Sequence, residues 1–178
     1  ATSEIEEMTK ATRKIGIGVM GFADLLIQLR IPYASQEAIN LGRDIMSSIR
    51  QSADQASIEL AVKRGTFPAW EESNFNKITE AYRNSCRMTV APTGTISMIA
   101  DCSSGIEPTF ALAWEKQNIL EGQTLVYTNK YFEQIAKDQG FYSTSLMTYL
   151  VEGGSLQHRG DVPDDIKELF MTASEISP

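Results

Sequence analysis

The stretch that decides the fold is MTVAPTGTISMIA, residues 88–100. Met88–Ala91 is short, apolar and partly β-branched, which predicts a buried strand. Pro92 ends that strand, and the apolar run Ile96–Ala100 predicts a short helix directly after the bend. Because one strand cannot form a parallel sheet by itself, the pattern predicts an α/β fold in which this chain is one part of a larger domain.

The residues before this stretch are predicted to be almost entirely helical. The longest helix, Ser35–Lys63, carries an amphipathic stripe and is expected to end at a left-handed Gly65. The residues from Pro68 to Lys77 are predicted to form a loop. In chain order, helices are predicted at Thr2–Lys14, Val19–Leu29, Ser35–Lys63 and Ile78–Tyr82.

The residues after the stretch are predicted to be mixed. Two strands and then three helices are expected, with glycines at the ends of the first two helices. The whole chain, residues 1–178, is therefore predicted to be a fragment of a single domain, with a helical portion 1–83 and a mixed portion 84–178. The predicted elements are the strands Leu112–Ile119 and Thr124–Val126 and the helices Asn129–Gln139, Ser143–Glu152 and Pro163–Ser174.

Composition excludes several classes of function. The chain has 178 residues with 42% hydrophobic content, which is typical of a globular protein rather than a disordered one. A net charge of −7 leaves no basic stripe for duplex nucleic acid. There is neither an apolar run of about 18 residues for a membrane span nor a signal peptide. Two cysteines are too few for a secreted disulfide framework, so a cytoplasmic location is expected.

The candidate binding site is the strand-to-helix bend at residues 93–97. The first turn of a helix leaves about four N–H groups unpaired and carries a partial positive charge, which favours phosphate. The alternative is a helix cap whose hydroxyls serve only the backbone, and the spacing by itself favours that alternative. The residues expected to hold phosphate are Thr93, Gly94, Thr95, Ile96 and Ser97.

Other patterns in the chain give weaker evidence for a functional site. Cys102 could act as a nucleophile only with a base, and the one histidine, His158, lies in a polar loop where solvation is expected. Residues 16–21 have the spacing GxGxxG but no preceding strand, so they predict close helix packing rather than a dinucleotide site. No spacing of Cys, His and carboxylates predicts a metal site.

Two motifs resemble the large, catalytic subunit of ribonucleotide reductase. The first is RKIGIGVMGFAD at residues 13–24, and the second is APTGTIS at residues 91–97 followed by SSGIEP at residues 103–108. Their spelling is most similar to the adenosylcobalamin-dependent, class II branch of the family. The resemblance covers residues 10–120 closely and the remainder loosely.

The resemblance implies a ten-stranded α/β barrel that reduces the ribose 2′-carbon of ribonucleotides through a thiyl radical, for DNA synthesis. It implies adenosylcobalamin as the cofactor of the parent protein and places the substrate phosphates on residues 93–97, largely through backbone N–H groups. The family's Asn-x-Cys-x-Glu loop and its C-terminal cysteines do not occur in this chain. Cys86 and Cys102 therefore receive no redox role, and the chain alone is expected to be inactive.

Two alternatives stay open at this point. A class I or a glycyl-radical relative would share the barrel but not the cobalamin. A noncatalytic helical interaction module would use Ser35–Lys63 as its partner face, but it would leave both motifs unexplained. Exposed apolar surface is also expected to favour self-association into a homo-oligomer. Whether the substrate is a di- or a triphosphate is not decided by the residues.

Overall fold

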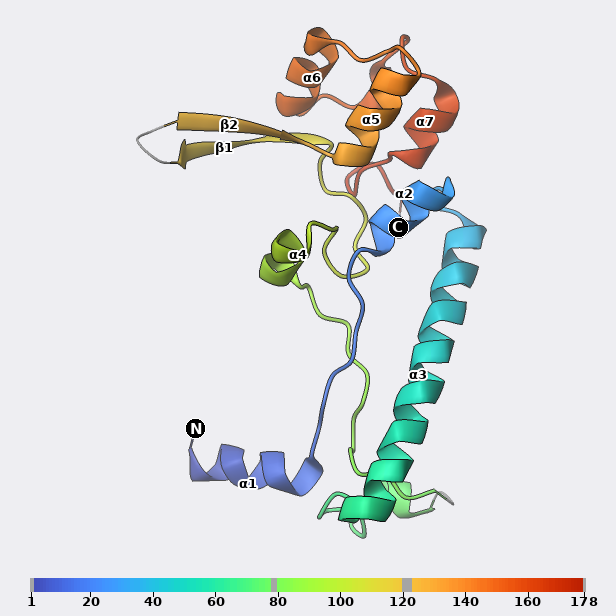
Figure 1. The fold of residues 1–178 in the computed structure, drawn as a ribbon, viewed down its shortest axis with the longest axis vertical. Coiled ribbons are helices and arrows are strands. Elements are labelled where there is room, and N and C mark those ends of the chain that lie inside the picture. Colours follow the sequence, from blue (N-terminus) through green and yellow to red (C-terminus); the bar gives the residue numbers. More distant parts are fainter. Residues whose placement is uncertain (1, 78–79, 120–122, 178) are drawn as a thin grey trace. The chain divides into compact units, whose positions relative to one another are not determined.

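The computed structural model describes residues 2–77, 80–119 and 123–177 (Figure 1). The chain divides into two compact units, residues 1–19 with 40–91 and residues 20–39 with 92–178, so neither unit is continuous in sequence. No helix among the described residues is long and apolar enough to span a membrane. The helices and strands are α1 (Ser3–Thr12), α2 (Phe22–Leu29), α3 (Gln36–Arg64), η1 (Asn74–Lys77), α4 (Gly94–Ala100), β1 (Ala113–Ile119), β2 (Gln123–Thr128), α5 (Lys130–Asp138), α6 (Thr144–Val151), η2 (Leu156–His158) and α7 (Asp164–Leu169).

The long helix α3 confirms the predicted amphipathic helix and its ends. The Ser35 hydroxyl accepts a hydrogen bond from the N–H of Ala38 at 3.1 Å, which caps the first turn. At the other end Gly65 adopts a φ of +77°, the left-handed conformation that glycine tolerates best. Arg83 donates hydrogen bonds to the three carbonyl groups of residues 64–66, where a cation is favoured by the helix dipole.

The loop after α3 has its own aromatic core. Phe67, Trp70 and Tyr82 are buried together, and Phe75 packs against them in the single turn η1. The predicted helix Ile78–Tyr82 is not found, since residues 80–82 are not helical and residues 78–79 lie outside the described part of the chain. The cluster explains why a segment rich in turn signals is held in place, because aromatic rings bury large areas.

The predicted buried strand at residues 88–91 is wrong. Met88 makes one isolated parallel bridge with Ile17, and Val90 is 69% exposed. The pairing partner is the extended segment 15–17, whose N–H groups at Ile15 and Ile17 donate to the carbonyl groups of residues 86 and 87 at 3.0 and 2.8 Å. This pairing also corrects the prediction of close helix packing around Gly16 and Gly18, because those glycines approach an extended backbone instead.

The second unit contains the predicted antiparallel pair and a helical core. Strands β1 and β2 pair antiparallel with Ala113 opposite Thr128, and Trp114 stacks on Tyr127 at 5.9 Å between ring centroids. Helices α5, α6 and α7 lie close to one another in Figure 1. The largest fully buried side chains of this core are Phe132, Leu146, Leu156, Ile166 and Phe170.

Helix caps in this unit follow the sequence closely. Asn129 accepts hydrogen bonds from the N–H groups of residues 131 and 132, and Ser143 accepts one from Leu146. Gly140 and Gly153 follow the two helices with positive φ. The last helix is shorter than predicted, because α7 ends at Leu169 rather than at Ser174.

The segment after α7 is fixed by a carboxylate. Glu175 accepts hydrogen bonds from the Ser155 hydroxyl and from both the N–H and the hydroxyl of Thr172, the latter two at 2.7 and 2.9 Å. Burial alone would raise the pKa of Glu175, but these hydrogen bonds together lower it. Residues 172–174 were predicted to be helical, but they are held instead by the hydrogen bonds of the Glu175 carboxylate.

Candidate functional site

The candidate phosphate loop starts helix α4. Thr93 precedes the helix with a φ of +51°, which is uncommon for a residue other than glycine. Among the described residues, no protein group accepts a hydrogen bond from the backbone N–H of Gly94, Thr95 or Ile96. All three residues are exposed, and a Cβ on Gly94 would meet no atom within 4 Å. Three neighbouring donors therefore point to solvent at the positive end of a helix.

Two of the five predicted site residues anchor the loop from within. The Thr93 hydroxyl accepts a hydrogen bond from the N–H of Gly105 at 2.7 Å. Ser97 is 2% exposed, and its N–H donates to the carbonyl of Thr93 at 2.9 Å. The Ser97 hydroxyl lies 3.2 Å from the carbonyl of Gly94 and 3.1 Å from the hydroxyl of Ser104. The N–H and the hydroxyl of Ser97 are therefore both used inside the protein, and phosphate binding by Ser97 stays a prediction.

The turn at residues 102–105 lies behind the loop and is bound to the start of α2. Asp24 accepts a hydrogen bond from the N–H of Ser103 at 2.8 Å, and the N–H of Asp24 donates to the Ser103 hydroxyl at 3.2 Å. The N–H of Gly21 adds a bond to the Ser103 carbonyl at 2.8 Å. Gly21 itself has a φ of +82° at the N-cap of α2. The end of the first motif and the SSGIEP part of the second motif are thus in direct contact.

A hollow of about 630 Å³ lies on this unit, beside the turn and the start of α5. Its wall includes the side chains of Asp24, Asp101, Glu107 and Lys130, but not residues 93–96. Three carboxylates against one ammonium make this wall acidic, so it repels a phosphate group. The free N–H groups of the loop open to solvent rather than into this hollow, and an anion is expected at the loop alone.

Charges around the hollow are partly neutralised. The Lys130 ammonium donates to both the carbonyl and the carboxylate of Asp101, each at 2.6 Å, and this hydrogen bond raises the pKa of Lys130. Burial raises the pKa of Asp24, against the hydrogen bond from Ser103 and the charge of Lys130, which lower it. Asp24 is only 7% exposed.

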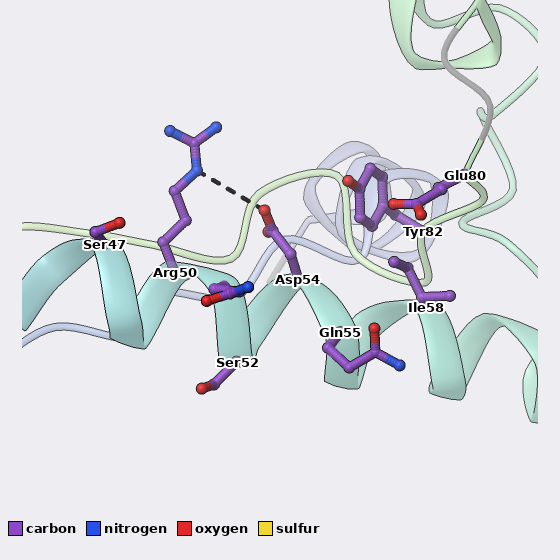
Figure 2. A pocket seen from close by; sticks show the side chains of 9 residues that line it. Ser47, Arg50, Ser52, Asp54, Gln55, Ile58, Glu80 and Tyr82 are labelled. Carbon is purple, nitrogen blue, oxygen red and sulfur yellow. Dashed lines mark ion pairs between the residues drawn. The ribbon is translucent and has the colours of Figure 1, made fainter.

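A second hollow, of about 760 Å³, lies on the other unit along α3 (Figure 2). Two of its charged side chains pair: Arg50 lies 3.8 Å from Asp54, one helical turn away. Asp54 also accepts a hydrogen bond from the guanidinium of Arg87, which does not line the hollow. The Arg87 guanidinium lies 4.1 Å above the Tyr82 ring centre as well. These contacts hold the aromatic cluster against α3. The charged residues here therefore have a structural role.

The remaining candidates have ordinary surroundings. Cys86 and Cys102 are both free thiols, and Cys86 donates to the carbonyl of Met88 at 3.4 Å. His158 is exposed in η2 and lines neither hollow. Within the described part of the chain, no group of three or more His, Cys, Asp and Glu side chains could hold a metal ion.

Sequence reasoning missed Asp24 and Ser104. The available signal was a carboxylate within the apolar helix segment Phe22–Leu29, where an acid needs a buried partner. The partner, Ser103, lies 79 residues away in sequence, so its identity required the structure.

Comparison with known proteins shows the same family along the whole chain. The family model described as "Ribonucleotide reductase, barrel domain" matches residues 1–82 and 77–178. The chain is 48% identical over 175 residues to a vitamin B12-dependent ribonucleoside-diphosphate reductase of Thermoplasma acidophilum, and 43% identical to one of Mycobacterium tuberculosis. These matches cover 98% of this chain but 22% and 25% of the relatives, so the chain spans about a quarter of their length or less.

Relatives at lower identity include subunits called alpha. A ribonucleoside-diphosphate reductase subunit alpha of Chlamydia muridarum is 33% identical over 99% of the chain and 20% of that relative. The solved class Id ribonucleotide reductase alpha subunit of Actinobacillus ureae superposes with a TM-score of 0.74 at 26% identity, covering 95% of this chain and 29% of that one. The expectation of an α/β barrel fragment is confirmed, and the chain belongs to the ribonucleotide reductase barrel-domain family.

Proposed function

We propose that the protein containing this chain reduces ribonucleoside diphosphates to deoxyribonucleotides, and that residues 93–97 bind the phosphates of the substrate. The observation that carries the site is the set of three unpartnered N–H groups on Gly94, Thr95 and Ile96 at the start of α4. The names of the relatives supply the diphosphate, since both the B12-dependent proteins and the alpha subunit are called ribonucleoside-diphosphate reductases.

The loop suits a phosphate without any lysine. Each hydrogen bond to a charged group contributes about 1.5–3 kcal/mol, and the helix dipole adds about 0.3–1 kcal/mol at an exposed end. Gly94 leaves space for a phosphate oxygen to approach the backbone, since no atom lies where its Cβ would be. Thr93 and Ser97 contribute by fixing the backbone, because their polar groups are bonded within the protein.

We propose adenosylcobalamin as the cofactor of the parent protein, because the relatives at 43–48% identity are B12-dependent while the alpha subunit is 33% identical. Bound adenosylcobalamin would supply a radical. The described residues of this chain offer no histidine that would hold this group, since the one histidine is exposed and outside both hollows. We assign no residue here to the corrin.

No residue of this chain is assigned to the radical step either. Cys86 is bonded to a backbone carbonyl, and Cys102 packs against Gly21, where an added Cβ would lie 3.3 Å from the Cys102 Cβ. The thiyl radical is therefore proposed to reside on a cysteine outside this chain, and the chain alone is expected to show no turnover. Self-association and a cytoplasmic location stay predictions.

The test compares two substitutions at one residue in the full-length reductase. Thr95→Pro removes one N–H donor, and proline is tolerated in the first turn of a helix, so folding should persist. Thr95→Ala keeps the N–H and removes the hydroxyl together with the Cγ2 methyl group. We expect Thr95→Pro to weaken binding of a nucleoside diphosphate about ten-fold or more, as for one charge-assisted hydrogen bond. Thr95→Ala should change the Kd much less.

The readout is isothermal titration with the nucleoside diphosphate and with the matching nucleoside. The nucleoside has no phosphates, so its Kd should be the same for both variants and the wild type. Equal diphosphate affinity in the wild type and Thr95→Pro would overturn the assignment of the loop.

A further inference from the structure

We propose that Asp24 is a positioning residue for the phosphate loop, acting through the turn at residues 102–105. The inference rests on the proposed function of residues 93–97. It assigns a role to a buried carboxylate on α2 that does not touch the phosphate itself.

The first link joins Asp24 to the turn. Asp24 and Ser103 form a reciprocal pair, in which the carboxylate accepts the Ser103 N–H at 2.8 Å and the Ser103 hydroxyl accepts the Asp24 N–H at 3.2 Å. The carbonyl of Ser103 is held as well, by the N–H of Gly21 at 2.8 Å. All the polar groups of Ser103 are therefore bonded to α2 and its N-cap, and the turn cannot shift without breaking them.

The second link joins the turn to the loop. Gly105 donates its N–H to the Thr93 hydroxyl at 2.7 Å, and the hydroxyls of Ser104 and Ser97 lie 3.1 Å apart. The N–H of Cys102 donates to the carbonyl of Ser97 at 3.0 Å. The two ends of the loop, Thr93 and Ser97, are thus bonded to three residues of the turn (102, 104 and 105), while the free N–H groups lie between them.

The loop needs this external support because of its own conformation. A left-handed φ at a β-branched residue such as Thr93 is costly, and it persists only when the surroundings hold it. Helix α4 has seven residues, which is too short to hold its first turn by helix formation alone. Without the turn, Thr93 is expected to relax, and the three N–H groups would no longer converge on one anion.

The surroundings of Asp24 show which side chains could make its contact with Ser103. The side chain must accept a hydrogen bond in a place that is 93% shielded from water, given its 7% exposure. The carboxylate has no ion pair among the described residues, since the Lys130 ammonium is bonded to Asp101. An amide oxygen would serve as the same acceptor with less cost of burial, so asparagine should replace aspartate while alanine should not.

The experiment uses the full-length reductase with Asp24→Ala and Asp24→Asn. The control is Asp101→Asn, which removes a carboxylate from the same hollow without touching the turn; asparagine tolerates the left-handed φ of +52° at that position. Titrations are made with inorganic pyrophosphate, a nucleoside diphosphate and the matching nucleoside. We expect Asp24→Ala to weaken both phosphate ligands about ten-fold, the size of one charge-assisted hydrogen bond.

Binding of the nucleoside should not change, and Asp24→Asn and Asp101→Asn should stay within about two-fold of the wild type for every ligand. In turnover, KM for the diphosphate should rise in Asp24→Ala more than kcat falls, since the loop binds the ground state as well as the transition state. A merely structural role would weaken all ligands alike.

If Asp24→Ala does not fold, Ser104→Ala decides the question, because it removes one bond between turn and loop without altering α2. It should weaken the phosphate ligands selectively by a smaller factor. The inference fails if Asp24→Ala (or Ser104→Ala, where Asp24→Ala does not fold) binds pyrophosphate as the wild type does while Thr95→Pro does not. If Thr95→Pro also binds pyrophosphate normally, the phosphate loop itself is refuted.

Discussion

The close approach of two extended segments makes a sharp prediction about Gly16 and Gly18. A Cβ added at Gly18 would lie 2.7 Å from the carbonyl oxygen of Thr89, which is backbone. A Cβ at Gly16 would instead lie 2.7 Å from the Thr89 Cγ2 and 2.9 Å from its Cβ. The first contact cannot be relieved by a side-chain change, because the N–H of Thr89 is bonded to Ile17 at 3.0 Å and holds the segment. The second can be relieved in part.

Overpacking of this kind costs about 1–3 kcal/mol, and for 150–250 residues each kcal/mol lowers Tm by about 2–4 °C. We expect Gly18→Ala at the upper end of that range and Gly16→Ala below it. Adding Thr89→Ser, which removes the Cγ2, should restore part of the Tm lost in Gly16→Ala and none of that lost in Gly18→Ala. Gly160→Ala is the control, because no atom lies within 4 Å of its Cβ position.

The assay is thermal unfolding followed by circular dichroism for the wild type, the single variants and the two double variants. The interaction energy of each pair is then obtained from a double-mutant cycle. The close approach of Thr89 to the two glycines would be refuted by either of two results. One is a recovery of Tm by Thr89→Ser that is equal for both glycine variants. The other is a Gly18→Ala variant as stable as Gly160→Ala.

Two further predictions concern polar groups of the two units. Ser57→Ala removes the acceptor of the Asn84 N–H and the donor to its amide oxygen, and it should cost about 1–3 kcal/mol in urea denaturation; Ser52→Ala, on the exposed side of the same helix, should cost under about 0.5 kcal/mol. Glu175 has a lowered pKa, so its hydrogen bonds stabilise the fold above the unfolded-state value of 4.5 and this contribution is lost as pH falls through the folded-state pKa. Glu175→Gln should therefore lower Tm at neutral pH and flatten the acid-side fall in Tm, and an unchanged slope would contradict the assignment.

Local signals predicted the helices well. The caps at Ser35, Asn129 and Ser143 and the left-handed Gly65 and Gly140 were all readable, because each acts within a few residues of its own helix. The prediction of a hydrophobic stripe along α3 was less accurate. Ile39, an apolar residue near the start of the helix, is 56% exposed. The buried positions along the helix are Ala38, Ala53, Ser57 and Ala61.

Contacts between distant residues could not be predicted in this way. A strand at residues 88–91 was expected from β-branched and apolar residues, but strand formation depends on partners elsewhere, and the described residues offer only segment 15–17. The bend after it was correctly identified as a helix start, yet its anchoring by Gly105 and Ser104 is invisible to a reading of local spacing. The donors of the candidate site were therefore predictable, and their support was not.

The three glycines within residues 16–21 show why a sequence motif alone does not identify a nucleotide site. Its first two glycines leave room for Thr89 beside an extended segment, so each is needed for the absence of a side chain. Gly21 is needed for a different reason: it takes a φ of +82° to begin α2 and lies against Cys102. A dinucleotide site would require the glycines to follow a strand, with the first in a tight turn, the second at the pyrophosphate and the third where the helix packs on the strand. The same GxGxxG spacing thus serves two separate packing needs, and the proposed phosphate donors belong to the later bend, which has one glycine.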